Sequence, residues 1–285
     1  MSESTVLYDL PGPGTRRRHG LYAAVSTAAL VGVVCWLLFL LLDSGQFTAV
    51  KWTPFQYKGI QELLLRGLGN TLKAFALAAV LSLALGVVLA AGRLSAHRPV
   101  RWLAALLVEF FRAMPVLVMI FFIFVALRVQ ALPALVAGLT FYNGSVLAEV
   151  FRTGVNSVER GQREAAYGLG MRKTQVMSHV LVPQAARAML PTIVSQLVVA
   201  LKDTSLGYLI TYEEFLHAGK LIASNLDYDL PFIPVVMVIS PIYIGMCMLL
   251  SWFAHRLARR QRRSPRTEAA GVPPAEPGTL LPGAQ

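Results

Sequence analysis

The chain has 285 residues, of which 55% are hydrophobic and only 14% are charged. Soluble domains carry about 25% charged residues, and the mean hydropathy of +0.58 leaves too little polar surface to cover a water-soluble globule. This composition excludes an intrinsically disordered chain, a collagen-like chain and a typical cytosolic enzyme. The two cysteines lie in apolar runs and the five histidines have no metal-ligand spacing, so a disulfide framework and a metal centre are excluded as well.

Six apolar runs are long enough to cross a bilayer, because roughly 20 residues of helix span the hydrocarbon core. Helix is the structure that satisfies every backbone N–H and C=O within one segment in lipid, so we predict an all-α, polytopic membrane protein with about six transmembrane helices. A signal peptide is the alternative for the first run, but the run is too long for a signal core and no small-residue cleavage site follows it. The runs are Tyr22–Leu42, Ala74–Gly92, Trp102–Leu127, Leu132–Phe151, Met189–Ile210 and Leu230–Ala254.

Basic residues gather in alternate loops. Under the positive-inside rule they place both termini, and the loops after the second and fourth runs, in the cytoplasm. This placement accounts for the net charge of +11 without a nucleic-acid partner. The basic residues on this side are Arg16–Arg18, Arg93, Arg98, Arg101, Arg160, Arg163, Arg172, Lys173, Arg187 and six arginines between 256 and 266.

The two ends of the chain are expected to be additions to the bundle. Residues 1–20 form a cytoplasmic N-terminal tail, and residues 21–42 form an extra transmembrane helix. Residues 264–285 are rich in proline, glycine and alanine and have few bulky apolar side chains. We therefore expect them to form a disordered cytoplasmic tail.

The loop between the fourth and fifth runs, residues 155–187, is the most informative stretch. Its pattern predicts two short amphipathic helices joined near Gly168 and Gly170, where Gly170 adopts a positive φ and ends the first helix. We expect Arg172–Thr174 to open the second helix and Pro183 to end it. An apolar stripe on these helices would face a partner or the floor of the bundle.

Three residues of the first short helix indicate a docking surface. Glu164 is expected in the first turn, where a carboxylate suits the helix dipole. Ala165 and Ala166 would leave a smooth surface that another protein can approach closely. If the spacing of its residues is left aside, the same loop can be interpreted as an ordinary amphipathic connector.

The spacing of the loop resembles the EAA loop of ABC-transporter permease subunits. That motif has Glu-Ala-Ala, a glycine four residues after the second alanine, and an aliphatic-x-aliphatic-Pro ending. Here valine replaces the usual isoleucine and leucine at the two aliphatic positions. The residues on this spacing are Glu164, Ala165, Ala166, Gly170, Val180, Val182 and Pro183.

Further segments resemble the polar amino-acid uptake subfamily of these permeases. The resemblance covers residues 61–257, and the preceding helix stands outside it. One departure is Ala113-Met114, where the subfamily usually has Gly-Thr, and this bears on the shape of the pocket. The matching segments are Leu68–Leu72, Glu109–Leu117, Glu149–Arg152, Pro183–Pro191 and Lys202–Leu206.

The resemblance implies a transporter subunit of the bacterial plasma membrane and not an enzyme. Two permease chains, related but different, would line one pathway, and an extracytoplasmic binding protein would deliver the amino acid. Each chain would present its EAA helix to a dimer of ATPase subunits, which hold ATP and Mg²⁺, so this chain needs no cofactor of its own. The extra helix and arginine-rich tail resemble actinobacterial glutamate permeases, which favours glutamate as the substrate.

Ionisable residues within the predicted spans are costly in lipid and are candidates for the substrate pathway. Arginine, lysine and hydroxyl groups suit a substrate carboxylate, and carboxylates suit an ammonium group. The alternative is ion pairing between helices, or snorkelling to the membrane surface. Pro115, Pro133, Pro234 and Pro241 can break helices to line a cavity, or can simply kink them. The candidate residues are Glu109, Arg112, Glu149, Lys202, Asp203, Thr204 and Ser205.

Two other functions are compatible with a polytopic chain. A stand-alone ion-coupled amino-acid carrier would be expected to have inverted repeats or unwound paired segments, and the sequence has neither. A membrane-embedded enzyme would need a catalytic triad, a metal cluster or a phosphate loop, and none is present. The carrier is therefore the second interpretation, after the permease.

Overall fold

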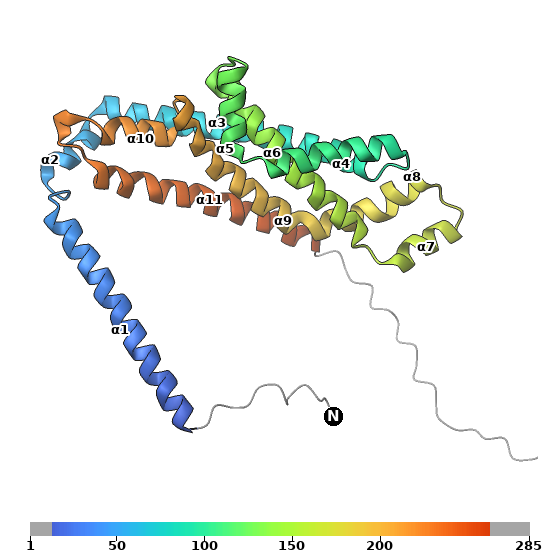
Figure 1. Cartoon of the computed structure of the whole chain (residues 1–285), viewed down its shortest axis with the longest axis horizontal. Helices are drawn as coiled ribbons and strands as arrows, with labels where there is room; N and C mark the ends of the chain where they lie inside the picture. Colours follow the sequence, from blue (N-terminus) through green and yellow to red (C-terminus); the bar gives the residue numbers. More distant parts are fainter. Residues whose placement is uncertain (1–12, 263–285) are drawn as a thin grey trace, which may run out of the picture. The chain divides into compact units, whose positions relative to one another are not determined.

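The computed structural model describes residues 13–262, so the predicted C-terminal tail and residues 1–12 lie outside the described part. Within that part every regular element is helical (Figure 1). The α-helices are α1 (Pro13–Asp43), α2 (Ala49–Trp52), α3 (Lys58–Arg93), α4 (Arg98–Ala113), α5 (Val116–Phe121), α6 (Ala131–Asn156), α7 (Arg160–Gly168), α8 (Lys173–Gln175), α9 (Val182–Asp203), α10 (Phe215–Ala223) and α11 (Phe232–Arg262). Helical turns of other types are Thr53–Gln56, Phe122–Ala126, Val176–Leu181, Thr204–Ile210 and Leu226–Tyr228.

The number of spans agrees with the sequence. Among the described residues, five helical segments are long and apolar enough to cross a membrane, and a sixth is obtained if α4 and residues 116–126 form one broken span. The five are Arg18–Asp43, Lys58–Arg93, Ala131–Asn156, Lys173–Ile210 and Phe232–Ala254.

Of the four prolines singled out in the sequence, one separates two helices and three lie within helices. Pro115 separates α4 from α5, since it has no N–H and disfavours helix at the residue before it. Pro133 and Pro234 instead lie in the first turns of α6 and α11, where a missing N–H costs nothing. Pro241 lies inside α11, which continues past it. Of the two alternatives given for these prolines, a helix break is found at Pro115 and not at the other three.

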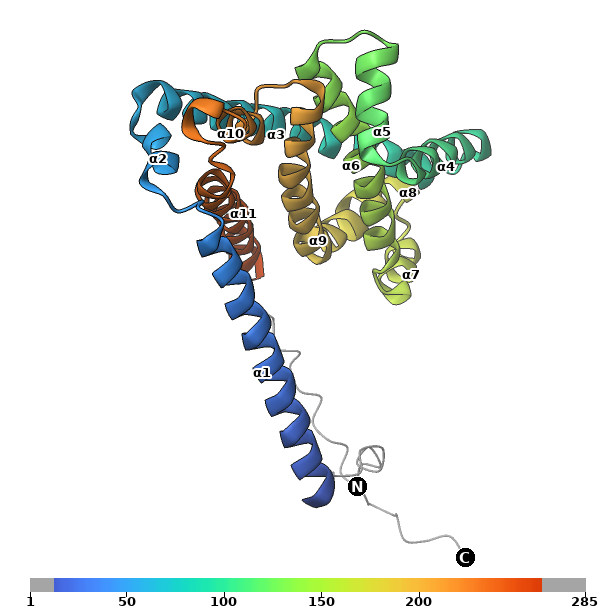
Figure 2. The ribbon, with the colours of Figure 1, turned by 60° about the vertical axis from the view of Figure 1, so that its left-hand side comes forward.

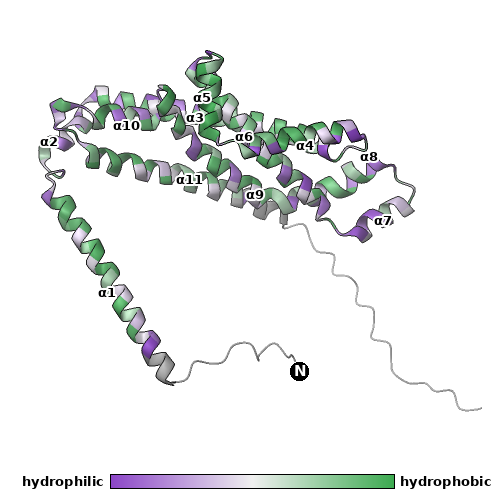
Figure 3. Ribbon diagram, viewed as in Figure 1, coloured by the Kyte–Doolittle hydropathy of each residue, from purple (hydrophilic) through white to green (hydrophobic). Residues whose placement is uncertain are grey.

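The first helix has the surface of a membrane span. None of its most apolar window is buried within the protein, and Trp36 and Leu42 are exposed. Figure 3 shows mainly hydrophobic residues along α1 after one hydrophilic turn near its N-terminal end. A helix that is apolar all round belongs in lipid or in a core. The span begins within the predicted N-terminal tail, because α1 starts at Pro13.

The structure has two compact units. The first comprises residues 1–80, 114–140 and 200–246, and the second comprises 81–113, 141–199 and 247–285. In the first unit, α10 packs along the beginning of α3, where Gly67 leaves room for Ala218 (Figure 2). The core around α10 contains Phe215, Ile222, Val235 and Ile239.

The second unit depends on close helix contacts at small residues. A Cβ atom on Gly86 would meet Leu147, and a Cβ atom on Gly154 would collide with Met189. Helices in lipid associate through such close approaches, because apolar burial gives little driving force between them. The ends of α6 and α9 are therefore held together directly beside the loop that joins them.

Candidate functional site

The loop predicted to dock a partner is a helical hairpin in the second unit, in which α7 leads through Gly170 into α8 (Figure 1). Gly170 has φ +78° and terminates α7, as predicted. Its N–H donates to the Tyr167 carbonyl at 2.9 Å, and the Met171 N–H donates to the Ala166 carbonyl at 3.2 Å. These two bonds form a Schellman motif, which requires a left-handed residue at this position. Glycine is used because it has no Cβ to strain that conformation.

The second half of the hairpin starts as predicted but does not end as predicted. Lys173 opens α8, and the preceding Arg172 N–H donates to the Gln175 side-chain oxygen at 2.8 Å. Pro183 does not end the helix, because the residues on both sides of it are helical: it follows the π turn at Val176–Leu181 and is the second residue of α9. Residues 173–210 thus form one continuous helical segment, with a wider π turn at Val176–Leu181. Val180 lies half-buried in that turn.

The residues exposed on the outward face of α7 are not all those expected from the sequence. Ala165 is exposed, but Ala166 is only 4% exposed and packs with Val155 and Met189, because consecutive helical residues point about 100° apart. The smooth surface predicted for both alanines is therefore provided by Ala165 alone. Glu164 is exposed, and it is the fifth residue of α7, not a member of the first turn.

Large apolar side chains complete this face. Leu169 is 82% exposed, and Tyr167 is 46% exposed. Both flank Gly168 at the tip of the hairpin, which the charge pattern predicts to lie in the cytoplasm. Exposed apolar groups beside a rigid turn are typical of a surface that binds another protein. Leu169 belongs to the apolar stripe predicted for these helices, whereas Tyr167 was not singled out in the sequence.

Three of the predicted pathway residues belong to one ion-pair cluster in the second unit. Glu149 pairs with Arg152 on α6 and with Arg93 at 3.0 Å. Arg93 also pairs with Glu109 at 3.2 Å, and Arg112 lies 3.8 Å from Glu109. The cluster therefore joins the end of α3 to α4 and α6.

Arg93 is the member of this cluster that the sequence did not identify. Its side chain is 16% exposed, and it bridges both carboxylates. The sequence placed it among the basic residues of a cytoplasmic loop, and no spacing rule connects it with Glu149, 56 positions later. Arg112 is more open, with 38% of its side chain exposed, so its guanidinium group retains donors for a ligand.

The remaining predicted pathway residues lie in the first unit. Lys202 is exposed and Asp203 is half-buried at the end of α9. Thr204 is fully buried, and its hydroxyl donates to the Leu201 carbonyl at 2.6 Å. Ser205 is half-buried in the 3₁₀ segment that starts at Thr204. This 3₁₀ segment ends the helical segment that begins at Lys173, and such turns are frequent at the C-termini of α-helices.

Comparison with known proteins establishes the family. Residues 82–263 match the binding-protein-dependent transport system inner membrane component family. That match covers well over half of the chain. The chain belongs to this family of transporter membrane components. It is therefore a multi-pass permease subunit and not an enzyme.

Individual relatives agree with this assignment. The glutamate transport system permease protein GluD of Corynebacterium glutamicum is 40% identical over 82% of this chain and 89% of its own length. The probable glutamine ABC transporter permease protein GlnP of Bacillus subtilis is 37% identical over 56% of this chain and 75% of its own length. The crystal structure of an amino acid ABC transporter with histidines superposes with a TM-score of 0.65 at 28% identity, covering 70% of this chain and 94% of that chain.

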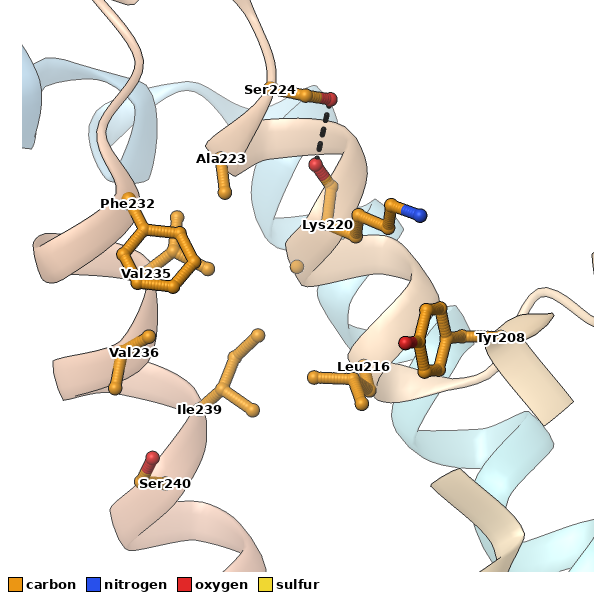
Figure 4. Close-up of a pocket in the computed structure, with 11 residues that line it drawn as sticks. Tyr208, Leu216, Lys220, Ala223, Ser224, Phe232, Val235, Val236, Ile239 and Ser240 are labelled. Carbon is orange, nitrogen blue, oxygen red and sulfur yellow. Dashed lines mark hydrogen bonds between the residues drawn. The ribbon is translucent and has the colours of Figure 1, made fainter. Parts of the chain in front are cut away.

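The permease has a cavity of about 450 Å³ in its first unit, between α10 and α11 (Figure 4). Apolar side chains such as Leu216, Val235 and Ile239 line it, and Lys220 lies 5.0 Å from the centre of the Tyr208 ring. None of the predicted pathway residues lines this cavity. Its apolar character does not suit a zwitterion, so it does not identify the substrate site.

Glu214 is a buried carboxylate that is not among the candidate residues identified from the sequence. It caps α10, where its side chain accepts bonds from the Leu216 N–H at 2.8 Å, the His217 N–H at 2.6 Å and the Tyr243 hydroxyl at 2.8 Å. Burial raises the pKa of Glu214, although these hydrogen bonds act in the opposite direction. The preferred N-cap residues are Ser, Thr, Asp and Asn, so a glutamate at this position gave no clear sequence signal for the cap.

The raised pKa predicts a stability that falls with pH. The folded protein holds the Glu214 proton more tightly than the unfolded chain, so the free energy of unfolding decreases as pH rises above the ordinary value of 4.5. Glutamine does not titrate, so Glu214→Gln should remove this decrease in the free energy of unfolding with rising pH. Glu213 is the exposed neighbouring residue, and Glu213→Gln should leave the decrease unchanged. The measurement is the thermal midpoint of the purified protein against pH. Parallel curves for the wild type and Glu214→Gln would contradict the prediction.

Proposed function

We propose that this permease translocates a polar amino acid, with glutamate as the first candidate, in an ABC importer driven by a separate ATPase subunit. The hairpin formed by α7 and α8 is the observation that carries the proposal. It offers an exposed Ala165, a turn fixed by Gly170 and an exposed Leu169. An ATPase groove that accepts this hairpin transmits its own closure to the permease.

The core of the second unit provides the mechanical link. Ala166 on α7 packs in one buried cluster with Val155 on α6 and Met189 on α9. Packed interiors transmit displacement because they contain few voids. A rigid shift of α7 therefore displaces the ends of α6 and α9, and alternation between two packings of these helices opens the pathway to either side.

Glutamate is favoured by two considerations. GluD of Corynebacterium glutamicum and GltK of Escherichia coli, named as glutamate and glutamate/aspartate permeases, are 40% and 29% identical to this chain. The ion-pair cluster contains Arg93, Arg112 and Arg152 against Glu109 and Glu149. An acidic amino acid has one more carboxylate than ammonium group, so a surplus of guanidinium groups complements it.

The proposed assembly contains several further parts. A second permease chain, related but different, completes the pathway, and an extracytoplasmic binding protein delivers the substrate. ATP and Mg²⁺ bind the ATPase subunits, which hydrolyse the nucleotide. Co-expression of these components with this chain would provide the complex for reconstitution.

The decisive experiment is ATP hydrolysis by the reconstituted complex across a panel of amino acids. We expect stimulation by an amino acid in the presence of its binding protein, and the largest stimulation with glutamate. Equal stimulation by glutamine would contradict selectivity for glutamate but would still support the importer function. ATP-independent uptake by this chain alone would reject the importer and favour an ion-coupled carrier.

Substitution of two cations tests the substrate pathway. Arg112→Gln and Lys202→Gln should each raise the glutamate concentration for half-maximal ATPase stimulation roughly tenfold, because a charge-assisted hydrogen bond contributes about 1.5–3 kcal/mol. Arg66→Gln is the matched control, since Arg66 is exposed and pairs with Glu62 on its own helix. An unchanged glutamate concentration for half-maximal stimulation in both variants would show that neither residue belongs to the substrate pathway.

A further inference from the structure

A small polar pocket lies inside the hairpin of the second unit. Its volume is about 200 Å³, and its polar lining comes from Arg163 and Tyr167 on α7, Lys173 on α8 and Asn156 at the end of α6. The two cations therefore face a common space from the two arms of the hairpin. Neither belongs to the residues assigned above to coupling or to substrate.

The cations of this pocket lack acidic partners within residues 13–262. Arg163 forms no ion pair there, and its Nε is buried without a hydrogen-bond partner. Lys173 also forms no ion pair there, and its amine makes one long bond of 3.4 Å to the Leu94 carbonyl. A buried donor of a charged group is costly when unpaired, and an anion in the pocket would satisfy it. Tyr167 and Asn156 add neutral donors to the same space.

A larger apolar cavity adjoins the polar pocket. Its volume is about 590 Å³, and it shares Leu94, Val155, Lys173 and Met177 with the smaller one. Its other walls include Ala90 on α3, and Ala186 and Leu190 on α9. From Val182 to Ile193 on α9 the lining extends about 16 Å along the helix axis, at 1.5 Å per residue. The combined space thus has a cationic end and a long apolar arm.

We infer that this space binds an anionic phospholipid of the cytoplasmic leaflet, with its phosphate between Arg163 and Lys173 and an acyl chain in the apolar cavity. The positive-inside rule places the hairpin at the cytoplasmic surface, where anionic lipid headgroups are found. Free phosphate would satisfy the cations but would leave the apolar arm unoccupied. A zwitterionic lipid would add an ammonium group close to two cations.

The bound lipid would join parts that move during transport. Its phosphate connects α7 to α8, and its acyl chain lies against α3, α6 and α9. The hairpin would be stiffer with the lipid than without it. This inference concerns lipid binding by the chain itself and does not rest on the identity of the transported amino acid.

Lipid binding to the purified full chain, measured by native mass spectrometry in detergent, tests the site. The probes are dioleoylphosphatidylglycerol, dioleoylphosphatidylcholine and sn-glycerol 3-phosphate. We expect the wild type to bind the anionic lipid selectively. Arg163→Gln and Lys173→Gln should each weaken that binding about fivefold, as removal of one cation near an anionic surface does. Arg160→Gln, an exposed arginine at the start of α7, is the matched control.

A third variant tests the apolar arm separately. Ala186→Phe fills the larger cavity from its wall and should weaken phosphatidylglycerol binding while leaving both cations in place. Ala186 is an exposed residue of α9, so the Ala186→Phe variant should fold even if the charge variants do not. Wild-type lipid binding in Ala186→Phe, or equal affinity for the anionic and zwitterionic lipids, would overturn the proposal. Glycerol phosphate binding as tight as that of the lipid would show a free-phosphate site instead.

Discussion

Replacement of Gly170 by valine is expected to uncouple the transporter. Gly170 has φ +78° and closes the Schellman motif between α7 and α8. A β-branched residue in this conformation costs about 1–3 kcal/mol, which the hairpin can relieve only by changing its turn. We expect at least a tenfold fall in substrate uptake by the reconstituted complex, with basal ATP hydrolysis by the ATPase retained. Membrane insertion should be normal, because a Cβ atom at Gly170 meets no atom within 4 Å.

Gly168→Ala provides the control for this substitution. Gly168 lies two residues earlier and has no positive φ, and a Cβ atom added there would likewise meet no atom within 4 Å. Alanine there should preserve uptake, because it favours helix. Wild-type uptake by Gly170→Val would contradict the role of the hairpin as the coupling element. Equal loss in both variants would show that steric bulk at the tip, and not the backbone conformation, is responsible.

Removal of Arg93 is expected to be the most destabilising single change in the ion-pair cluster. Arg93 pairs with Glu149 and Glu109, and both Arg93 and Glu149 are largely shielded from solvent. Arg93→Met should lower the free energy of unfolding by about 2–4 kcal/mol, since a shielded carboxylate loses a partner while the exposed Glu109 contributes little. Thermal unfolding of the purified chain in detergent measures this loss.

A double-mutant cycle separates ion pairing from packing. Glu149→Gln in the Arg93→Met background should cost less than Glu149→Gln alone, because the partner charge is already absent. Arg98→Met is the matched single control, since Arg98 is an exposed arginine at the start of α4. Additive effects of Arg93→Met and Glu149→Gln would mean that the pair contributes no coupling energy.

The hairpin and the ion-pair cluster are parts of the same unit. The hairpin packs against α6, and the ion-pair cluster includes residues of α6. Glu149 and Arg152 lie on that helix within the two turns before Val155, which packs against Ala166. A displacement of α7 is therefore transmitted to a segment of α6 that is fixed to α3 and α4 by charge. Under the proposed coupling, this arrangement would carry a displacement of the hairpin to the helices that bear the candidate pathway residues.

Sequence patterns predicted the structural features that depend on neighbouring residues in the chain. Long apolar runs specify membrane helices because lipid offers no partner for a backbone polar group, and the count of about six agrees with the structure. Gly170 was predicted to adopt a positive φ because few other residues tolerate that conformation, and it does. Helix boundaries were less accurate, since α3 begins at Lys58 and not near Ala74. Hydropathy detects the apolar stretch, whereas hydrogen bonding extends the helix into polar sequence.

The sequence by itself determined that this chain is a helical membrane protein with a turn at Gly170, because hydropathy and the need for a positive φ are properties of a residue and its neighbours. The tertiary structure alone decided that Ala166 faces the core, that Arg93 bridges Glu109 and Glu149, and that Glu214 is buried. Those outcomes depend on which helices pack together. Contacts between residues far apart in the chain leave no periodic signal in a single sequence.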